Sequence, residues 1–123
     1  MKKGNVAEVK ELTPREIVLK FIDALNKHDY VTARLYADDS MKFEGVLGSR
    51  SGAEAYFKDV EKMQLQYTLH KVFADDNDVC LLYDLPMSGV TIFCCGWYTV
   101  RAGKITSLKV IFDPRPVLEQ VKK

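Results

Sequence analysis

The sequence has little of the chemistry on which several common kinds of site depend. Among its 123 residues are three cysteines, two histidines and one tryptophan. Cys80, Cys94 and Cys95 do not make a disulfide framework, and no Cys-x-x-Cys or His-x-x-His spacing indicates zinc. We therefore interpret the cysteines as reduced, mostly buried thiols, and we expect neither a metal nor a redox cofactor.

Charge and hydropathy also exclude some classes of partner. Lys and Arg total 18 and Asp and Glu total 17, which leaves a net charge of +1. This balance gives no electrostatic reason to expect nucleic acid or an anionic membrane as a partner. No apolar run approaches the roughly 20 residues that span a bilayer, and the polar start MKKGNVAEVKE lacks the apolar core of a secretory signal. We therefore expect a cytoplasmic protein.

The length of the chain favours one domain, residues 1–123, with a core that needs no disulfide or metal to hold it. We expect residues 1–12 to be a poorly ordered or extra-helical segment. Helix starts are then visible from their capping residues. Thr13, Pro14 and Glu16 give a capping box with proline in the first turn.

Two further helix starts follow the same logic. Asp29 is predicted to cap a second helix, which Asp38 and Asp39 would close. Ser51 and Glu54 would form a capping box for a third helix.

Helices and strands are segregated along the chain, which argues for an α+β fold. The spacing of apolar residues predicts helices over 13–25, 30–37 and 51–63, a turn over 48–52, and strands over 41–47, 65–74, 78–87, 90–101 and 104–112. The last two strands are expected to form a tight hairpin around Ala102 and Gly103. We expect a sheet of about five strands that curls around the helices, with the proline-containing tail lying over a sheet edge.

The stretches FIDALNKHDYVTARLYADDSMKFEG and YTVRAGKITSLKVIFD resemble the NTF2-like superfamily, and its SnoaL-like branch in particular. The resemblance covers residues 13–113, with the YADD and GKI landmarks in register. It implies a cone-shaped barrel of three N-terminal helices on a curved, mostly antiparallel sheet, with an apolar pocket at the open end and dimerisation through the outer sheet face. That superfamily includes isomerases, cyclases, hydrolases, dehydratases, binding subunits and interaction domains, so the fold does not select an activity.

Glu44 is the first catalytic candidate, because the steroid-isomerase branch has a carboxylate base just after this landmark. An apolar pocket would raise the pKa of such a carboxyl group and make it a better base near neutrality. The alternative is a polar residue on the wet face of a strand. The oxyanion donors of that branch correspond here to Phe21 and Gly96, neither of which can donate through a side chain.

Two more acids have open alternatives. Asp84 lies in the otherwise apolar stretch VCLLYDLPM, either in a pocket, on an inward face with Leu82 and Pro86, or at a solvated edge. Asp113 follows the last strand, whereas the related cyclases have their aspartate at the position that is Val110 here. Asp113 either points into the mouth of the cone or forms an Asx-type turn.

Adjacent aromatic residues should separate onto the two faces of the sheet. The alignment places Tyr98 inward, where it could hydrogen-bond a ligand, and Trp97 outward, where an aromatic side chain suits a dimer interface. His70 is a further candidate base, although a lone histidine in a strand is more often structural.

The resulting hypothesis is a small homodimer whose pocket holds a small apolar molecule. The expected pocket walls are Phe21, Phe43, Tyr56, Leu82, Tyr98, Leu108, Val110 and Phe112, with Glu44, Asp84 and Asp113 as polar points. In an enzyme, Glu44 or Asp84 would transfer a proton and Tyr98 would assist. Two alternatives remain, a non-catalytic binding module and an interaction domain with a filled cone. Converging carboxylates favour the enzyme, and a roomy pocket with a single polar anchor favours the binder.

Overall fold

A computed structural model describes the backbone of residues 12–122 and the side chains of residues 12–119. Apart from Leu12, the N-terminal segment for which we predicted poor order therefore lies outside the described residues. The described helices are α2 (Pro14–Asn26), α3 (Tyr30–Leu35), α4 (Ala53–Met63) and α5 (Arg115–Lys122). The strands are β1 (Ala37–Gly45), β2 (Gly48–Ser51), β3 (Thr68–Asp75), β4 (Asp78–Met87), β5 (Val90–Arg101) and β6 (Lys104–Phe112).

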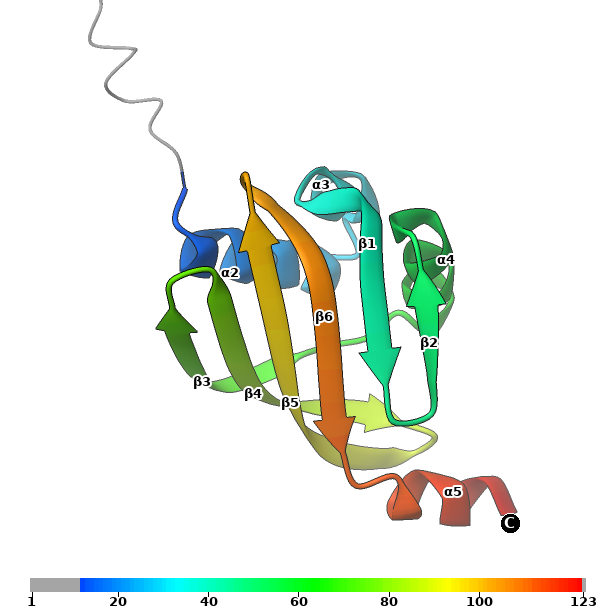
Figure 1. Cartoon of the computed structure of the whole chain (residues 1–123). Coiled ribbons are helices and arrows are strands. Elements are labelled where there is room, and N and C mark those ends of the chain that lie inside the picture. Colours follow the sequence, from blue (N-terminus) through cyan, green and yellow to red (C-terminus); the bar gives the residue numbers. More distant parts are fainter. Residues whose placement is uncertain (1–11, 123) are drawn as a thin grey trace, which may run out of the picture.

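The strands form one curved sheet that does not close, with α2 and α4 on one side of it (Figure 1). The strand order is β2-β1-β6-β5-β4-β3, and all neighbours are antiparallel except β1 and β6. The predicted α+β class and the mostly antiparallel sheet are confirmed. The sheet has six strands rather than about five, because the segment 48–51, predicted as part of a turn, pairs with β1 as β2.

The first helix begins as its sequence predicts. The Thr13 hydroxyl accepts the Glu16 backbone N–H at 3.1 Å, and the Glu16 carboxylate accepts the Thr13 N–H at 2.9 Å. Pro14 lies in the first turn of α2, where a backbone N–H would have no acceptor within the helix, so the lack of an N–H in proline costs no hydrogen bond. One side of α2 is buried against the concave face of the sheet through Ile17, Val18, Phe21, Ile22, Ala24 and Leu25.

The capping box predicted at Ser51 and Glu54 is absent. The helix begins at Ala53, so Ser51 lies one residue before the N-cap position, and it pairs with Lys42 as the last residue of β2. The N-cap is Gly52 instead, at φ 96, a left-handed backbone conformation that glycine adopts at little cost. The cap predicted at Asp29 is confirmed, since its carboxylate accepts the Thr32 N–H at 3.1 Å.

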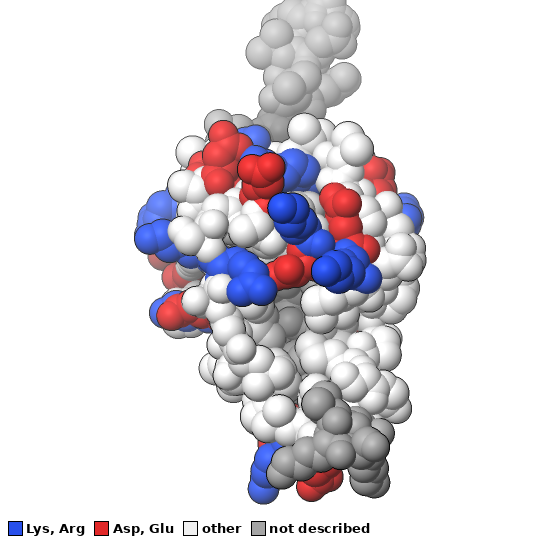
Figure 2. Space-filling view, turned by 90° about the vertical axis from the view of Figure 1, so that its right-hand side faces the viewer, with Lys and Arg blue, Asp and Glu red and all other residues white. Residues whose placement is uncertain are grey.

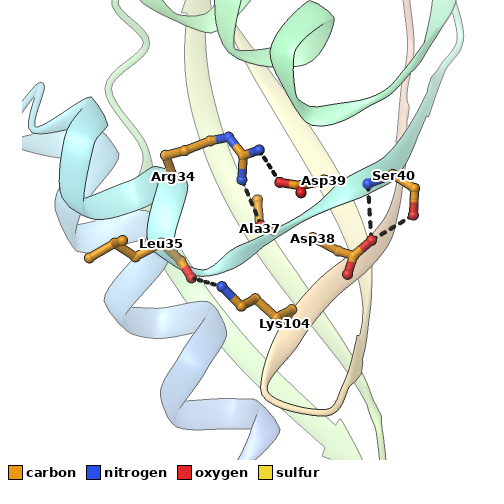
Figure 3. A network of polar contacts seen from close by, with 7 residues as sticks. All are labelled: Arg34, Leu35, Ala37, Asp38, Asp39, Ser40 and Lys104. Carbon is orange, nitrogen blue, oxygen red and sulfur yellow. Dashed lines mark hydrogen bonds and ion pairs between the residues drawn. The ribbon is translucent and has the colours of Figure 1, made fainter.

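Asp38 and Asp39 belong to β1, and the prediction that they close α3 is wrong (Figure 3). The helix ends at Leu35, and the chain enters β1 at Ala37. Asp38 accepts the backbone N–H and the hydroxyl of Ser40, at 3.0 and 2.6 Å. These contacts lower the pKa of the Asp38 carboxyl group.

Two basic side chains, Arg34 and Lys104, form polar contacts with the segment that joins α3 to β1 (Figure 3). Arg34 donates to the Ala37 carbonyl at 2.8 Å and forms an ion pair with Asp39. Lys104, at the start of β6, donates to the Leu35 carbonyl at 2.9 Å. The YADD landmark therefore joins α3 to β1 and β6, which is a structural role.

The last three strands have the bounds that the sequence predicts. The β5–β6 hairpin turns at Ala102 and Gly103, both at positive φ, as expected. The tail after Pro114 differs from the expectation, because it forms α5 and buries Val117. No helix among the described residues is long and apolar enough to cross a membrane.

Candidate functional site

A cavity of about 260 Å³ lies at the end of the sheet where β1 turns into β2. This turn, the end of β4 and the end of β6 lie at the same end of the molecule (Figure 1). Five of the residues predicted as pocket walls line the cavity, namely Phe43, Tyr56, Leu108, Val110 and Phe112.

The other three predicted wall residues, Phe21, Leu82 and Tyr98, are not among the residues that line the cavity. Phe21 is fully buried, with its ring 6.1 Å from that of Phe57 and 6.3 Å from that of Tyr98, so it belongs to the core beneath α2. Leu82 lies on the outer side of the sheet, because β4 buries the alternate positions.

Figure 2 shows the side of the molecule that contains α4 and β2. Charged side chains of both signs gather on its upper half, and most of the lower half, toward the cavity, lacks them. Exposed apolar side chains surround the cavity on this side, at Val46 and Leu47 in the hairpin turn and at Met63 at the end of α4. An apolar molecule would therefore approach the cavity over an uncharged rim.

The cavity lining contains one ion pair. Arg50 Nε lies 2.7 Å from Asp59 Oδ2, and both side chains are half-exposed. Within the part of the chain that the structure describes, Asp59 is the one carboxylate that lines the cavity. Because the Arg50 guanidinium compensates the charge of the Asp59 carboxylate, this pair can bind a polar group of a ligand at the cavity wall.

Three phenols line the cavity, those of Tyr56, Tyr67 and Tyr83, and all three residues are buried. A hydrogen bond between the side chains of Tyr56 and Tyr67 raises the pKa of Tyr56 and lowers that of Tyr67. Burial dominates in every case and raises the pKa of all three groups above the usual value for tyrosine. The phenols therefore remain protonated and act as hydrogen-bond donors rather than as bases.

Tyr98 lies on the inward face of β5, and Trp97 lies on the outer face. The Tyr98 hydroxyl is buried and has no hydrogen-bond partner among the described residues. Tyr98 is not among the residues that line the cavity. Its phenol lies deeper in the core, beside Phe21.

Glu44 lies on the outer side of the sheet, with its side chain 65% exposed. Its carboxylate is 3.6 Å from Lys109 Nζ, on the neighbouring strand β6. Phe43 precedes it and faces the cavity, so the alternation of the strand turns Glu44 away.

The expectation that Asp84 shares an inward face with Leu82 and Pro86 is wrong. In β4 the buried positions are Val79, Leu81, Tyr83 and Leu85, so Asp84 lies on the opposite face. There its carboxylate lies 3.0 Å from His70 Nε2, on β3. His70 and Asp84 therefore lie side by side on the outer face, and neither is among the residues that line the cavity.

Asp113 precedes α5 and forms an Asx-type turn, one of the two alternatives left open by the sequence. Its carboxylate accepts the backbone N–H of Arg115 at 3.0 Å and is paired with the guanidinium at 2.7 Å. These hydrogen bonds lower the pKa of Asp113 to about 2. Asp113 is not among the residues that line the cavity.

The cysteines are free thiols. Burial raises the pKa of Cys94 to about 11 and also raises that of Cys80. A thiol that keeps its proton is a poor nucleophile, which agrees with a packing role.

Sequence reasoning missed Arg50, Asp59, Tyr67 and Tyr83 as cavity residues. Arg50 was assigned to a turn, although β2 places it opposite Phe43. Tyr83 was omitted because placing Asp84 on the inward face of the strand puts its neighbour Tyr83 on the outer face. The signal that could have found Tyr83 is the alternation Val79, Leu81, Tyr83, Leu85, which is uniformly apolar or aromatic.

Comparison with known families finds that the SnoaL-like domain matches residues 18–108. An NTF2-like protein of unknown function from Cytophaga hutchinsonii is 44% identical, with a TM-score of 0.86 and 89% of this chain and 98% of that chain covered. A comparison with curated proteins gave no match.

Two more distant structures share the fold. An LEH-like epoxide hydrolase of M. tuberculosis is 22% identical, with a TM-score of 0.77 and 89% of each chain covered. A putative ketosteroid isomerase of Kribbella flavida is 14% identical, with a TM-score of 0.75 and 81% of this chain and 77% of that chain covered. At these identities the likeness concerns the fold alone.

Proposed function

Because the chain belongs to the SnoaL-like domain family, we propose that it uses the family's fold to bind a small apolar molecule in the cavity beside α4. The observation that supports this proposal is the chemistry of the lining. Aromatic and aliphatic side chains form most of it, and Arg50 with Asp59 is its one ion pair. Small-molecule sites typically combine apolar walls with a few placed polar groups.

The size of the cavity limits the ligand. Its volume of about 260 Å³ lies just below the range of about 300–1,000 Å³ that is usual for small-molecule sites. A single substituted ring fits this space better than a fused polycyclic molecule does. The uncharged rim formed by Val46, Leu47 and Met63 favours entry of a ligand without charge.

Binding fits the lining better than proton transfer does. A general base must lie within hydrogen-bond reach of the substrate proton. Glu44, Asp84 and Asp113 do not line the cavity, and Asp59 is held by Arg50. The three phenols keep their protons, because burial raises their pKa. The described lining therefore lacks the converging carboxylates that would favour an enzyme.

Titration calorimetry with α-methylstyrene, a nine-carbon substituted benzene, tests the proposal. Val110 faces the cavity and Ile111 lies on the outer side, so Val110→Phe and Ile111→Phe add the same bulk on opposite faces. We expect binding by the wild type and by Ile111→Phe, and at least about tenfold weaker binding by Val110→Phe, because its ring occupies the cavity. Absence of binding by the wild type, or equal affinity of the two variants, would contradict the proposal.

We also propose that a second copy of the chain covers the outer face of the sheet. Large apolar side chains are exposed there, at Phe73 (57%), Phe93 (59%), Trp97 (43%) and Ile111 (65%). Several polar groups on the same face already have partners within the chain. The indole N–H of Trp97 donates to Asp78 at 2.9 Å, and His70 contacts Asp84. An interface that covers these groups would therefore not leave Asp78 or Asp84 without a partner, and a symmetric dimer would pair the face with itself.

Sedimentation analysis tests this second proposal. The wild type should sediment as a dimer and Phe93→Asp as a monomer, because the substitution places an unpaired charge in the centre of the interface. Val31→Asp is the control, since Val31 is 80% exposed on α3, away from the sheet. A monomeric wild type, or a dimer that Phe93→Asp leaves intact, would overturn the proposal.

A further inference from the structure

One phenol of the cavity owes its position to a glycine in the adjacent strand. Gly96 pairs with Leu81, and Tyr83 follows on the same inward face of β4. A Cβ atom at position 96 would lie 3.1 Å from both Cε1 and the hydroxyl oxygen of Tyr83. The ring of Tyr83 therefore fills the space above the β5 backbone that any larger residue at position 96 would occupy.

The Tyr83 hydroxyl differs from the other two phenols of the lining. Tyr56 and Tyr67 form a hydrogen bond with each other. Tyr83 is only 1% exposed, and its hydroxyl has no hydrogen-bond partner among the described residues. In the described part of the chain, the hydroxyl groups that are fully enclosed without a partner are those of Tyr30 and Tyr98, and that of Tyr83 is not among them. The Tyr83 hydroxyl therefore keeps accessible surface at the cavity, where a ligand atom can accept its proton.

The surroundings of Tyr83 also limit the charge of such an atom. Leu85, Val110 and Phe112 line the cavity together with Tyr83. Arg50 is the one cation among the described residues of the lining, and it is paired with Asp59. An anionic group near Tyr83 would be buried without a free counter-charge, which is costly. A neutral oxygen acceptor meets no such penalty.

Building on the proposed binding function, we propose that the ligand contains a neutral oxygen acceptor, of the carbonyl or ether class, which accepts the O–H of Tyr83. Tyr83 is then the residue that distinguishes such ligands from hydrocarbons of the same shape. Gly96 is the residue that gives the phenol its room. Burial raises the pKa of Tyr83, so the group keeps the proton that it donates.

Two ligands of the same shape test this inference. Acetophenone and α-methylstyrene differ in one group, C=O in the first and C=CH₂ in the second. Calorimetry gives the ratio of their affinities in the wild type, in Tyr83→Phe and in the control Tyr98→Phe, whose phenol is buried outside the cavity lining. We expect the ratio to move about fivefold against acetophenone in Tyr83→Phe, as for the loss of one neutral hydrogen bond. It should stay unchanged in Tyr98→Phe.

A second measurement reports on the hydrogen bond itself. The carbonyl stretch of bound acetophenone should lie at lower wavenumber in the wild type than in Tyr83→Phe. An unchanged ratio and an unchanged stretch in Tyr83→Phe, with α-methylstyrene still bound, would overturn this inference and leave the proposed function standing. If the wild type binds neither molecule, both are overturned.

Discussion

The inward and outward faces of the sheet use the same strands and differ in their burial and in where their acids lie. In β4, Leu81 and Tyr83 are buried, whereas their neighbours Leu82 and Asp84 lie on the outer face. The inward face supplies phenols and apolar walls to the cavity, and the outer face has Asp84 paired with His70 and Glu44 near Lys109. Successive side chains of a strand point to opposite faces of the sheet. Whether an acid in this fold can contact a ligand in the cavity therefore depends on which of the two faces its position occupies.

The largest expected effect compares two adjacent leucines. Leu81→Ala removes a fully buried side chain from the inner face and should lower the free energy of unfolding by about 2–5 kcal/mol. Leu82→Ala, on the outer face, should cost less than about 1 kcal/mol. Urea denaturation of both variants in the Phe93→Asp background, where association is removed, measures the difference. Equal losses would contradict the assignment of the two faces.

A smaller effect is expected at Gly96. In Gly96→Ala the new methyl group would stand 3.1 Å from the rings of Tyr83 and Tyr98, so we expect a loss of about 1–3 kcal/mol from overpacking. Gly48→Ala is the matched control, since nothing lies within 4 Å of its added Cβ. Urea denaturation measures both variants. If Gly96→Ala were as stable as Gly48→Ala, the added methyl group would fit beside Tyr83 and Tyr98, and the predicted overpacking would be contradicted.

Acid should weaken the fold gradually through carboxylates at its surface. Hydrogen bonds hold the pKa of Asp38, Asp78 and Asp113 below the usual value of 3.8, in the last case at about 2. In that range the unfolded chain binds more protons than the folded one, so stability falls as the pH falls. Thermal melts should therefore show a decreasing Tm from about pH 4 toward pH 2, less steep in Asp113→Asn. A constant or rising Tm would be the contrary result.

The smallest effect is expected for the acids on the outer face. Glu44→Gln and Asp84→Asn should change the affinity for α-methylstyrene by less than about twofold, because neither side chain lines the cavity. Calorimetry under the conditions used for the wild type provides the comparison. A tenfold loss in either variant would place that acid in contact with the ligand and would return proton transfer to consideration.

Local signals predicted much of the fold. The Thr13 capping box, the cap at Asp29 and the hairpin at Ala102 and Gly103 depend on residues close in sequence, so the sequence alone locates them. β2 was missed because Gly48–Ser51 has turn-like composition and forms a strand only through its pairing with β1. Tertiary contacts, which local propensity does not contain, decide such segments.

The candidate site was less predictable, for a physical reason. Period-2 alternation separates the two faces of a strand without saying which one is buried. At Glu44 the resemblance and at Asp84 the inferred alignment favoured the inward face, and the packing of α2 and α4 selects the other. Arg50 and Asp59 come together from β2 and α4, a contact that neither segment encodes by itself.

Methyl-resolved NMR during a titration with α-methylstyrene tests the contrast between the faces most directly. Leu85, Leu108 and Val110 line the cavity, and Leu82 and Ile111 place their methyl groups on the other side of the sheet. We predict saturable shifts for the first set, caused by the ring current of the bound ligand, and none of comparable size for the second. Shifts confined to the second set would contradict an apolar binding site inside the curved sheet.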